Sequence, residues 1–221
     1  MMSKFIGIKA VGFDLDDTLV MTEPKAFETE NKVLVRMGHP PMSREVHLST
    51  WGQPLDEAVE LRAPGVNSQE FMKVFAEEFE KRLKRDDMDL LTESASSTLE
   101  YLSSKGYYLF ILTNRDGFET VHLTRGGHPI SVHIAPEDVY HRDNVDKPKP
   151  DAAAFNWLIA RGYKPEECVF VGDSLIDGQA ANAAGLKFIA TLESGIRADD
   201  YFKDIKVSAV INSFGDLKSL L

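Results

Sequence analysis

The chain has 221 residues, 43% of them hydrophobic and 27% charged, and this composition excludes a disordered or fibrous protein. Acidic residues outnumber basic ones by 35 to 25, so the net charge of -10 disfavours nucleic acid and anionic membranes as partners. No apolar run approaches the roughly 20 residues that cross a bilayer, and Lys9 interrupts the apolar stretch near the amino terminus before a signal-peptide core could form. The one cysteine, Cys168, cannot form a disulfide within the chain, so we expect a buried, inert thiol in a cytoplasmic protein.

Short apolar runs predict the strands of a parallel sheet. They span residues 9–13, 107–112, 131–135, 168–172, 187–191 and 208–212. These runs are continuous rather than alternating, which is typical of strands covered on both faces. Helix signals separate them from about residue 95 onwards, as in the segment that opens at Pro150 and closes at Gly162. The alternation predicts an α/β fold with a Rossmann-like three-layer parallel-sheet core.

Residues 21–92 break this rhythm and contain no good strand. Helix patterns cover residues 24–38, 54–61 and 67–85. The last of these patterns places several phenylalanines on one face, which indicates packing. We therefore expect a small all-α domain over residues 21–92, inserted into an α/β domain made of residues 1–20 and 93–221.

Chemistry-bearing side chains follow several of the predicted strands, at the edge where open parallel sheets bind ligands. They are Asp14, Asp16 and Thr18 in "FDLDDTLV", Thr113 and Asn114 in "FILTNRD", Asp173 and Asp177 in "VFVGDSLID", and Lys147 in the loop "DNVDKPKPD". Clustered carboxylates repel one another unless a hard cation such as Mg²⁺ lies among them. With a cation and a lysine to offset the charge, a carboxylate could attack a phosphate ester and form an aspartyl phosphate. The pattern therefore favours phosphoryl transfer over a solvated acidic loop.

The six histidines show no metal-site spacing with one another or with Cys168. They are His39, His47, His122, His128, His133 and His141. We expect them to be surface or ordinary packing residues.

The chain resembles the haloacid dehalogenase superfamily of aspartyl-phosphate-forming hydrolases. The matching stretches are "FDLDDTLV", "ILTNR", "KPKPD" and "VGDSLIDGQAANAAG". Within the superfamily it is similar to phosphoglycolate-phosphatase-like and beta-phosphoglucomutase-like members that carry a helical cap. Lys149 adds a second cation to the lysine motif, Asp17 replaces a frequent Gly, and Met21 replaces a frequent Asp.

The resemblance implies a role for each matching residue. Asp14 would be the nucleophile and Asp16 the general acid and base, while Thr113, Asn114 and Lys147 would bind the phosphate oxygens. Mg²⁺ would be held by Asp14, the backbone carbonyl of Asp16, Asp173 and Asp177. Thr18 would complete the phosphate-binding loop, and the turn in "STWGQPLDEAVEL", with Trp51 and Gln53, would contact the leaving group of the substrate.

The function predicted from these residues is a Mg²⁺-dependent phosphatase that hydrolyses a small phosphorylated metabolite as a monomer or homodimer. A phosphomutase differs only in the acceptor of the phosphoryl group, and the core motifs do not separate the two. A non-enzymatic phosphoacceptor would stall after roughly one turnover. A dehalogenase would have no use for the acid at Asp16, because a halide leaving group needs no proton.

Overall fold

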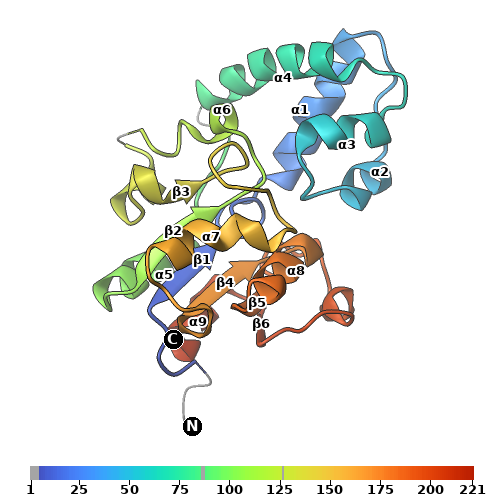
Figure 1. The fold of residues 1–221 in the computed structure, drawn as a ribbon. Helices are drawn as coiled ribbons and strands as arrows, with labels where there is room; N and C mark the ends of the chain where they lie inside the picture. Colours follow the sequence, from blue (N-terminus) through green and yellow to red (C-terminus); the bar gives the residue numbers. More distant parts are fainter. Residues whose placement is uncertain (1–4, 86–87, 126) are drawn as a thin grey trace. The chain divides into compact units, whose positions relative to one another are not determined.

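One parallel sheet organises the larger part of the chain. The computed structural model describes residues 5–85, 88–125 and 127–221, and within them six parallel strands pair in the order β3-β2-β1-β4-β5-β6 (Figure 1). The strands are β1 (Ala10–Phe13), β2 (Tyr108–Leu112), β3 (Val139–Tyr140), β4 (Cys168–Gly172), β5 (Lys187–Thr191) and β6 (Ala209–Ile211). The central position of β1, between β2 and β4, brings the carboxyl ends of these three strands together.

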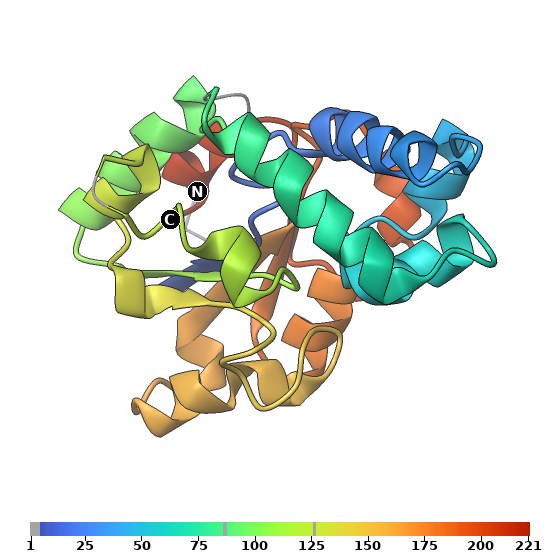
Figure 2. The same cartoon turned by 90° about the horizontal axis from the view of Figure 1, so that it is seen from above.

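Helices cover both faces of the sheet, because successive side chains of each strand point to opposite sides. Val11 and Phe13 belong to a core with α5 (Glu93–Ser104) and α9 (Leu217–Leu220). Ala10 and the phenylalanines of the neighbouring strands belong to a second core with α7 (Asn156–Ala160) and α8 (Leu175–Ala183). The sheet thus forms the middle of three layers (Figures 1 and 2). The predicted α/β fold class is confirmed.

The predicted strand at residues 131–135 is wrong. The backbone N–H of Ile134 donates to the carbonyl of Ile130 at 3.0 Å, which is a helical spacing, and Pro129–Val132 form a 3₁₀ turn. Within the run, Ile134 is buried but Val132 is 76% exposed, so the segment lacks the two covered faces of a strand inside the sheet. The strand in this part of the sheet is β3, which pairs with β2 through Ile111 and Val139.

The described chain divides into two compact units, residues 1–20 with 91–221, and residues 21–90. The chain leaves the first unit at Val20 and returns at Leu91, and these two residues pair in an antiparallel bridge. The second unit contains α1 (Glu23–Arg36), α2 (Arg44–Ser49), α3 (Leu55–Arg62) and α4 (Ser68–Leu83). Residues 1–4 of the predicted α/β domain and 86–87 of the predicted all-α domain lie outside the described residues.

The second unit has a hydrophobic core of its own. Phe71, Phe75 and Phe79 recur along the buried face of α4 and pack against Val33 and Leu34 of α1. Asn67 begins α4 as predicted, because its side chain accepts a hydrogen bond from the backbone N–H of Glu70 at 2.9 Å. The sequence did not predict α2, which is only six residues long.

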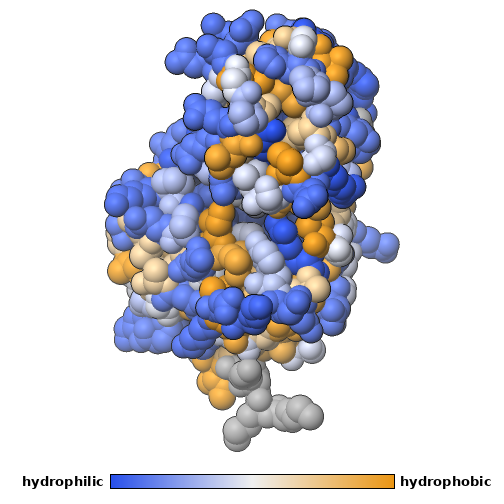
Figure 3. Space-filling model, turned by 90° about the vertical axis from the view of Figure 1, so that its right-hand side faces the viewer, coloured by the Kyte–Doolittle hydropathy of each residue, from blue (hydrophilic) through white to orange (hydrophobic). Residues whose placement is uncertain are grey.

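Polar residues predominate on the face drawn in Figure 3, with smaller groups of hydrophobic residues between them. Among the described residues, no helix combines the length and the hydropathy that a membrane crossing requires.

Candidate functional site

Asp14 follows β1 directly, and its carboxylate lies against a buried lysine. Lys149 Nζ is 2.6 Å from Asp14 Oδ1 and 2.6 Å from Asp177 Oδ1, and 2% of the lysine side chain is exposed. The backbone N–H of Asp14 donates to the Val171 carbonyl of β4 at 2.8 Å, which fixes the residue at the end of the sheet. A buried ammonium between two carboxylates is stable because each charge compensates the other.

The loop that carries Lys149 is tied to the end of β2 by Asn114. The Asn114 side chain accepts from the backbone N–H of Lys149 at 3.0 Å and donates to the Lys149 carbonyl at 2.9 Å. Two hydrogen bonds to one residue hold its backbone in a single orientation. The predicted role of Asn114, phosphate binding through its backbone N–H, stays a prediction, and its side chain positions the lysine.

Asp177 lies in the first turn of α8, where Ser174 is the N-cap. The Ser174 hydroxyl donates to Asp177 Oδ2 at 2.6 Å, and the Ser174 backbone N–H donates to the same oxygen at 3.1 Å. Gly172 leaves room for this carboxylate, since a Cβ at that position would lie 2.5 Å from Asp177 Oδ2. The site therefore needs glycine at the end of β4.

Asp173 completes a group of three carboxylates. Each of Asp14, Asp173 and Asp177 offers an oxygen within 4.8 Å of the others, and all three residues are buried. Asp173 Oδ2 is buried and has no hydrogen-bond partner among the described residues. A hard divalent cation prefers such oxygens and would satisfy the unpartnered one, so these residues fit Mg²⁺.

The electrostatics of the group favour an added positive charge. Burial, reinforced by the negative charge of Asp177, raises the pKa of Asp14 to about 7 although the Lys149 ammonium opposes this shift. Burial and the charges of Asp177 and Asp14 also raise the pKa of Asp173 well above its ordinary value. For Lys149, burial lowers the pKa, but the Asp14 and Asp177 carboxylates outweigh it and raise the pKa. One ammonium does not offset the repulsion among the carboxylates, and a cation would.

Asp16 lies near the same strand end and pairs with a residue that the sequence analysis did not assign. Arg115 Nη2 is 2.6 Å from Asp16 Oδ1, and Arg115 Nε is 3.0 Å from Asp16 Oδ2. The guanidinium side chain is 7% exposed and the carboxylate side chain 20% exposed. Such a two-pronged pair fixes the carboxylate in one orientation. Arg115 follows Asn114 directly in the strand-end segment "FILTNRD". Its position next to a predicted site residue is the feature of the sequence that could have identified it.

Thr113 and Thr18 are also buried beside the strand ends. The Thr113 hydroxyl accepts from the backbone N–H of Arg115 at 3.2 Å. The Thr18 hydroxyl is buried and has no hydrogen-bond partner in the described part of the chain. Their roles in binding phosphate stay predictions.

The structure corrects the choice of lysine. Lys147 was predicted at the site, but its side chain is 65% exposed and its Nζ lies 3.3 Å from Asp151 Oδ2. Lys149, two residues further along "KPKP", occupies the place between Asp14 and Asp177. The reason is a tertiary contact, because Asn114 anchors the backbone of residue 149 and thereby aims that side chain at the carboxylates.

Trp51 and Gln53 belong to the unit of residues 21–90. They lie in the turn between α2 and α3, with Trp51 partly buried and Gln53 exposed. Their role in reading a substrate stays a prediction.

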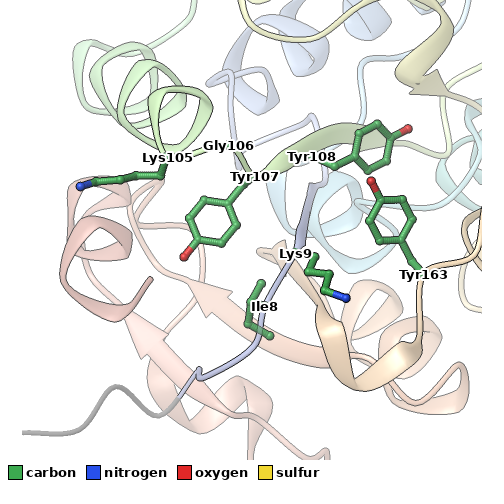
Figure 4. Close-up of a pocket in the computed structure, with 7 residues that line it drawn as sticks. All are labelled: Ile8, Lys9, Lys105, Gly106, Tyr107, Tyr108 and Tyr163. Carbon is green, nitrogen blue, oxygen red and sulfur yellow. The ribbon is translucent and has the colours of Figure 1, made fainter.

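A hollow of about 540 Å³ lies at the opposite, amino-terminal edge of the sheet (Figure 4). Its lining includes Lys9 just before β1, Tyr107 and Tyr108 at the start of β2, and Tyr163. The Tyr107 hydroxyl donates to the Leu221 carbonyl and the Tyr108 hydroxyl donates to Asp138, so both polar ends have structural partners. None of the carboxylates described above lines this hollow, and we assign the chemistry to the Asp14 edge.

Cys168 is buried in β4 on the same sheet. Burial raises the pKa of its thiol to about 11, so the thiolate is scarce at neutral pH. This agrees with the expectation of an inert thiol.

Comparison with known proteins agrees with this arrangement. The family described as "Haloacid dehalogenase-like hydrolase" matches residues 11–191, which include all of the strand-end carboxylates. The chain belongs to this family. The resemblance inferred from the motifs is confirmed, and so is the prediction of a hydrolase.

Relatives cover nearly the whole haloacid dehalogenase-like chain. The phosphoglycolate phosphatase of Aliivibrio fischeri is 30% identical over 228 residues, which cover 98% of this chain and 98% of the relative. A haloacid dehalogenase-like hydrolase from Bacteroides fragilis shares the fold with a TM-score of 0.81 at 23% identity, over 95% of this chain and 99% of that one. A Bacteroides vulgatus structure described as a beta-phosphoglucomutase has a TM-score of 0.76 at 22% identity, over 97% of this chain and 87% of that one.

The raised pKa of Asp14 predicts how the stability of the metal-free protein depends on pH. Between its ordinary value of 3.8 and about 7 the folded state keeps a proton that the unfolded state releases. The free energy of unfolding should therefore fall as pH rises through this window, and Asp14→Asn should flatten the slope. Denaturant unfolding in chelator at several pH values measures it. An unchanged slope in the variant would show that Asp14 is not the group responsible.

Proposed function

We propose that the protein is a Mg²⁺-dependent phosphatase that hydrolyses a small phosphate monoester through an aspartyl phosphate on Asp14. The observation that carries the proposal is the buried Asp14 carboxylate, held 2.6 Å from the Lys149 ammonium and grouped with Asp173 and Asp177. An anionic nucleophile can approach an anionic phosphate only where positive charge is fixed nearby, and Lys149 supplies such charge. The phosphatases among its relatives support the same activity.

In the first step a carboxylate oxygen of Asp14 attacks phosphorus, and the bond between phosphorus and the ester oxygen breaks. Asp16 in its acid form gives a proton to the departing oxygen. In the second step Asp16 takes a proton from water, the water oxygen attacks phosphorus, and the bond to Asp14 breaks to release phosphate. Because Arg115 holds both oxygens of Asp16 in the structure, Asp16 must exchange at least one of these contacts for the ester oxygen.

Mg²⁺ would be held by the carboxylates of Asp14 and Asp173 and by the backbone carbonyl of Asp16, with Asp177 as a supporting residue. When bound, it supplies positive charge that offsets the charge of the phosphate oxygens. Asp177 already accepts hydrogen bonds from Lys149 and Ser174, which suits a supporting role. Thr113, Thr18 and the backbone N–H of Asn114 would bind phosphate oxygens together with Lys149.

The core residues would bind only the phosphate group and the metal, so another surface must recognise the leaving group. We assign this role to the unit of residues 21–90, acting as a cap on the catalytic core, with hinges at residues 20–22 and 90–94. Within it, Trp51 and Gln53 would contact the leaving group. The loop offers an aromatic ring and an amide there, which favours a neutral or weakly polar leaving group. The cytoplasmic location and the monomeric or homodimeric state stay predictions.

Substitutions of Asp14, Lys149 and Lys147 test the proposed nucleophile and the choice of lysine. Asp14→Asn should abolish phosphate release, because an amide is a poor nucleophile. Lys149→Met keeps an unbranched side chain, one atom shorter, but removes its charge, and should lower kcat/KM by about 100-fold or more. Lys147→Met is the matched control and should stay within about twofold of wild type. Activity that survives in Asp14→Asn would end the proposal, and continued turnover by wild type separates a phosphatase from a phosphoacceptor.

The role of Asp16 is tested with two substrates that differ in the quality of the leaving group. Asp16→Asn should lower kcat much more for glycerol 3-phosphate, an alkyl ester with an uncharged leaving group, than for p-nitrophenyl phosphate, whose leaving group needs less protonation. The measurement is kcat for both substrates in wild type and variant. Equal losses would show that Asp16 is not the acid.

Metal dependence is tested by chelation and by Asp173→Ala. Phosphate release should stop in chelator and return with Mg²⁺, whereas Ca²⁺ should substitute poorly because its coordination is larger and looser. Asp173→Ala should raise the Mg²⁺ concentration for half-maximal activity by about tenfold or more. The measurement is a Mg²⁺ titration of activity. Identical titration curves for variant and wild type would remove Asp173 from the metal site.

A further inference from the structure

A second group of buried charges lies in the unit of residues 21–90, around His47. The His47 side chain is 0% exposed, with Nδ1 3.1 Å from Glu23 Oε1 and Nε2 3.2 Å from Glu30 Oε1. Both glutamates are buried and come from the same face of α1. The sequence analysis expected a surface or ordinary packing role for this histidine, and the structure places both of its ring nitrogens against carboxylates.

Both ring nitrogens of His47 lie within hydrogen-bond distance of a carboxylate oxygen. A neutral ring carries a single N–H, so its other nitrogen would turn a lone pair towards a carboxylate oxygen. The contacts are satisfied when the ring carries both protons, or when one glutamate is protonated. Arg44 also contacts Glu23, and Arg62 contacts Glu30, so the charges of both glutamates have further partners.

The buried charged group around His47 fixes both ends of the turn that contains Trp51. His47 lies in α2, which precedes the turn, and Arg62 lies at the end of α3, which follows it. Arg62 Nη1 is 2.6 Å and 2.8 Å from the two oxygens of Glu30, while Arg62 Nε donates to the Thr50 hydroxyl at 2.7 Å. Glu30 therefore joins the helices on either side of residues 50–53.

Trp51 packs directly on this group. Its ring centroid is 4.9 Å from that of His47, and the Arg62 guanidinium carbon is 6.0 Å from the Trp51 ring centroid. On another side, the Phe27 ring lies 5.3 Å from His47. The face of an indole ring attracts cations, so a protonated His47 and Arg62 would both hold the ring in place.

We propose that His47 is a positioning residue: bridged between Glu23 and Glu30, it fixes Trp51 and the turn of residues 50–53 for contact with the leaving group. This inference rests on the proposed function, because the turn has a substrate only if the protein hydrolyses phosphate esters. A fixed ring loses little conformational freedom when it binds a ligand, which lowers KM without altering the chemical step.

The experiment follows the motion of Trp51 and the kinetics in the same variants. The chain has 2 tryptophans, so Trp157→Phe leaves Trp51 as the only tryptophan, which can be excited selectively over the tyrosines. In that background, His47→Gln removes the ring, and its two N–H donors lie on one nitrogen, so they cannot reproduce contacts made by two separate ring nitrogens. Fluorescence anisotropy decay should show faster local motion of Trp51. KM for glycerol 3-phosphate should rise about tenfold, while kcat and both constants for p-nitrophenyl phosphate stay within about twofold.

Two further variants keep the test decisive. His39→Gln is the matched control, because it makes the same change at a partly exposed histidine of the same unit, and it should leave Trp51 motion and KM unchanged. Glu30→Gln keeps the shape of the glutamate but removes its charge, and it should loosen Trp51 in the same direction. Glu30→Gln therefore still tests the inference if the His47→Gln variant fails to fold.

The possible results separate the inference from the proposed function. Unchanged Trp51 motion in both His47→Gln and Glu30→Gln would overturn the inference, and so would equal losses of kcat/KM on the two substrates. If wild type hydrolysed neither ester, the proposed function would fail. The anisotropy measurement alone would then decide whether His47 positions the turn.

Discussion

The catalytic core depends on the charge balance around Lys149. Three carboxylates reach one strand edge, and burial together with their mutual repulsion would drive protons onto them. The ammonium offsets part of that repulsion, and it is itself buried only because Asp14 and Asp177 compensate it. The neighbouring structure serves this balance, since Asn114 fixes the lysine backbone and Gly172 leaves space for Asp177.

The parallel sheet and its strand-end carboxylates were predictable because continuous apolar runs and the residues after them are local in sequence. The choice between Lys147 and Lys149 was not local. Lys147 and Lys149 lie in the same motif, and each is followed by proline. The feature that distinguishes them is the contact between the Asn114 side chain and the backbone of residue 149. The false strand at 131–135 failed for a related reason, since a short apolar run does not reveal that its Val132 is exposed and that the segment begins with a 3₁₀ turn.

Buried ion pairs between distant segments could not be predicted from the sequence, because they too depend on tertiary contacts. Arg115 and Asp16 are 99 residues apart in the sequence, and neither segment contains a pattern that identifies the residue with which it pairs. His47 was set aside because its spacing matched no metal site, yet its environment is defined by two glutamates of another helix. Spacing identifies ligands that share a segment, whereas a charge pair formed by folding becomes visible only in three dimensions.

Both units place a nitrogen-bearing side chain between two carboxylates, and the consequences differ with what remains without a partner. In the larger unit, Asp173 adds a third carboxylate with an unpartnered oxygen, so the group retains an affinity for cations. In the unit of residues 21–90, Glu23 contacts Arg44 and Glu30 contacts Arg62 in addition to His47, so both carboxylates have an arginine partner and the contacts hold the helices together. The pair of Asp16 and Arg115 differs from both groups, because one carboxylate meets one guanidinium and the Asp16 side chain is 20% exposed, so water can compensate its charge when the pair opens.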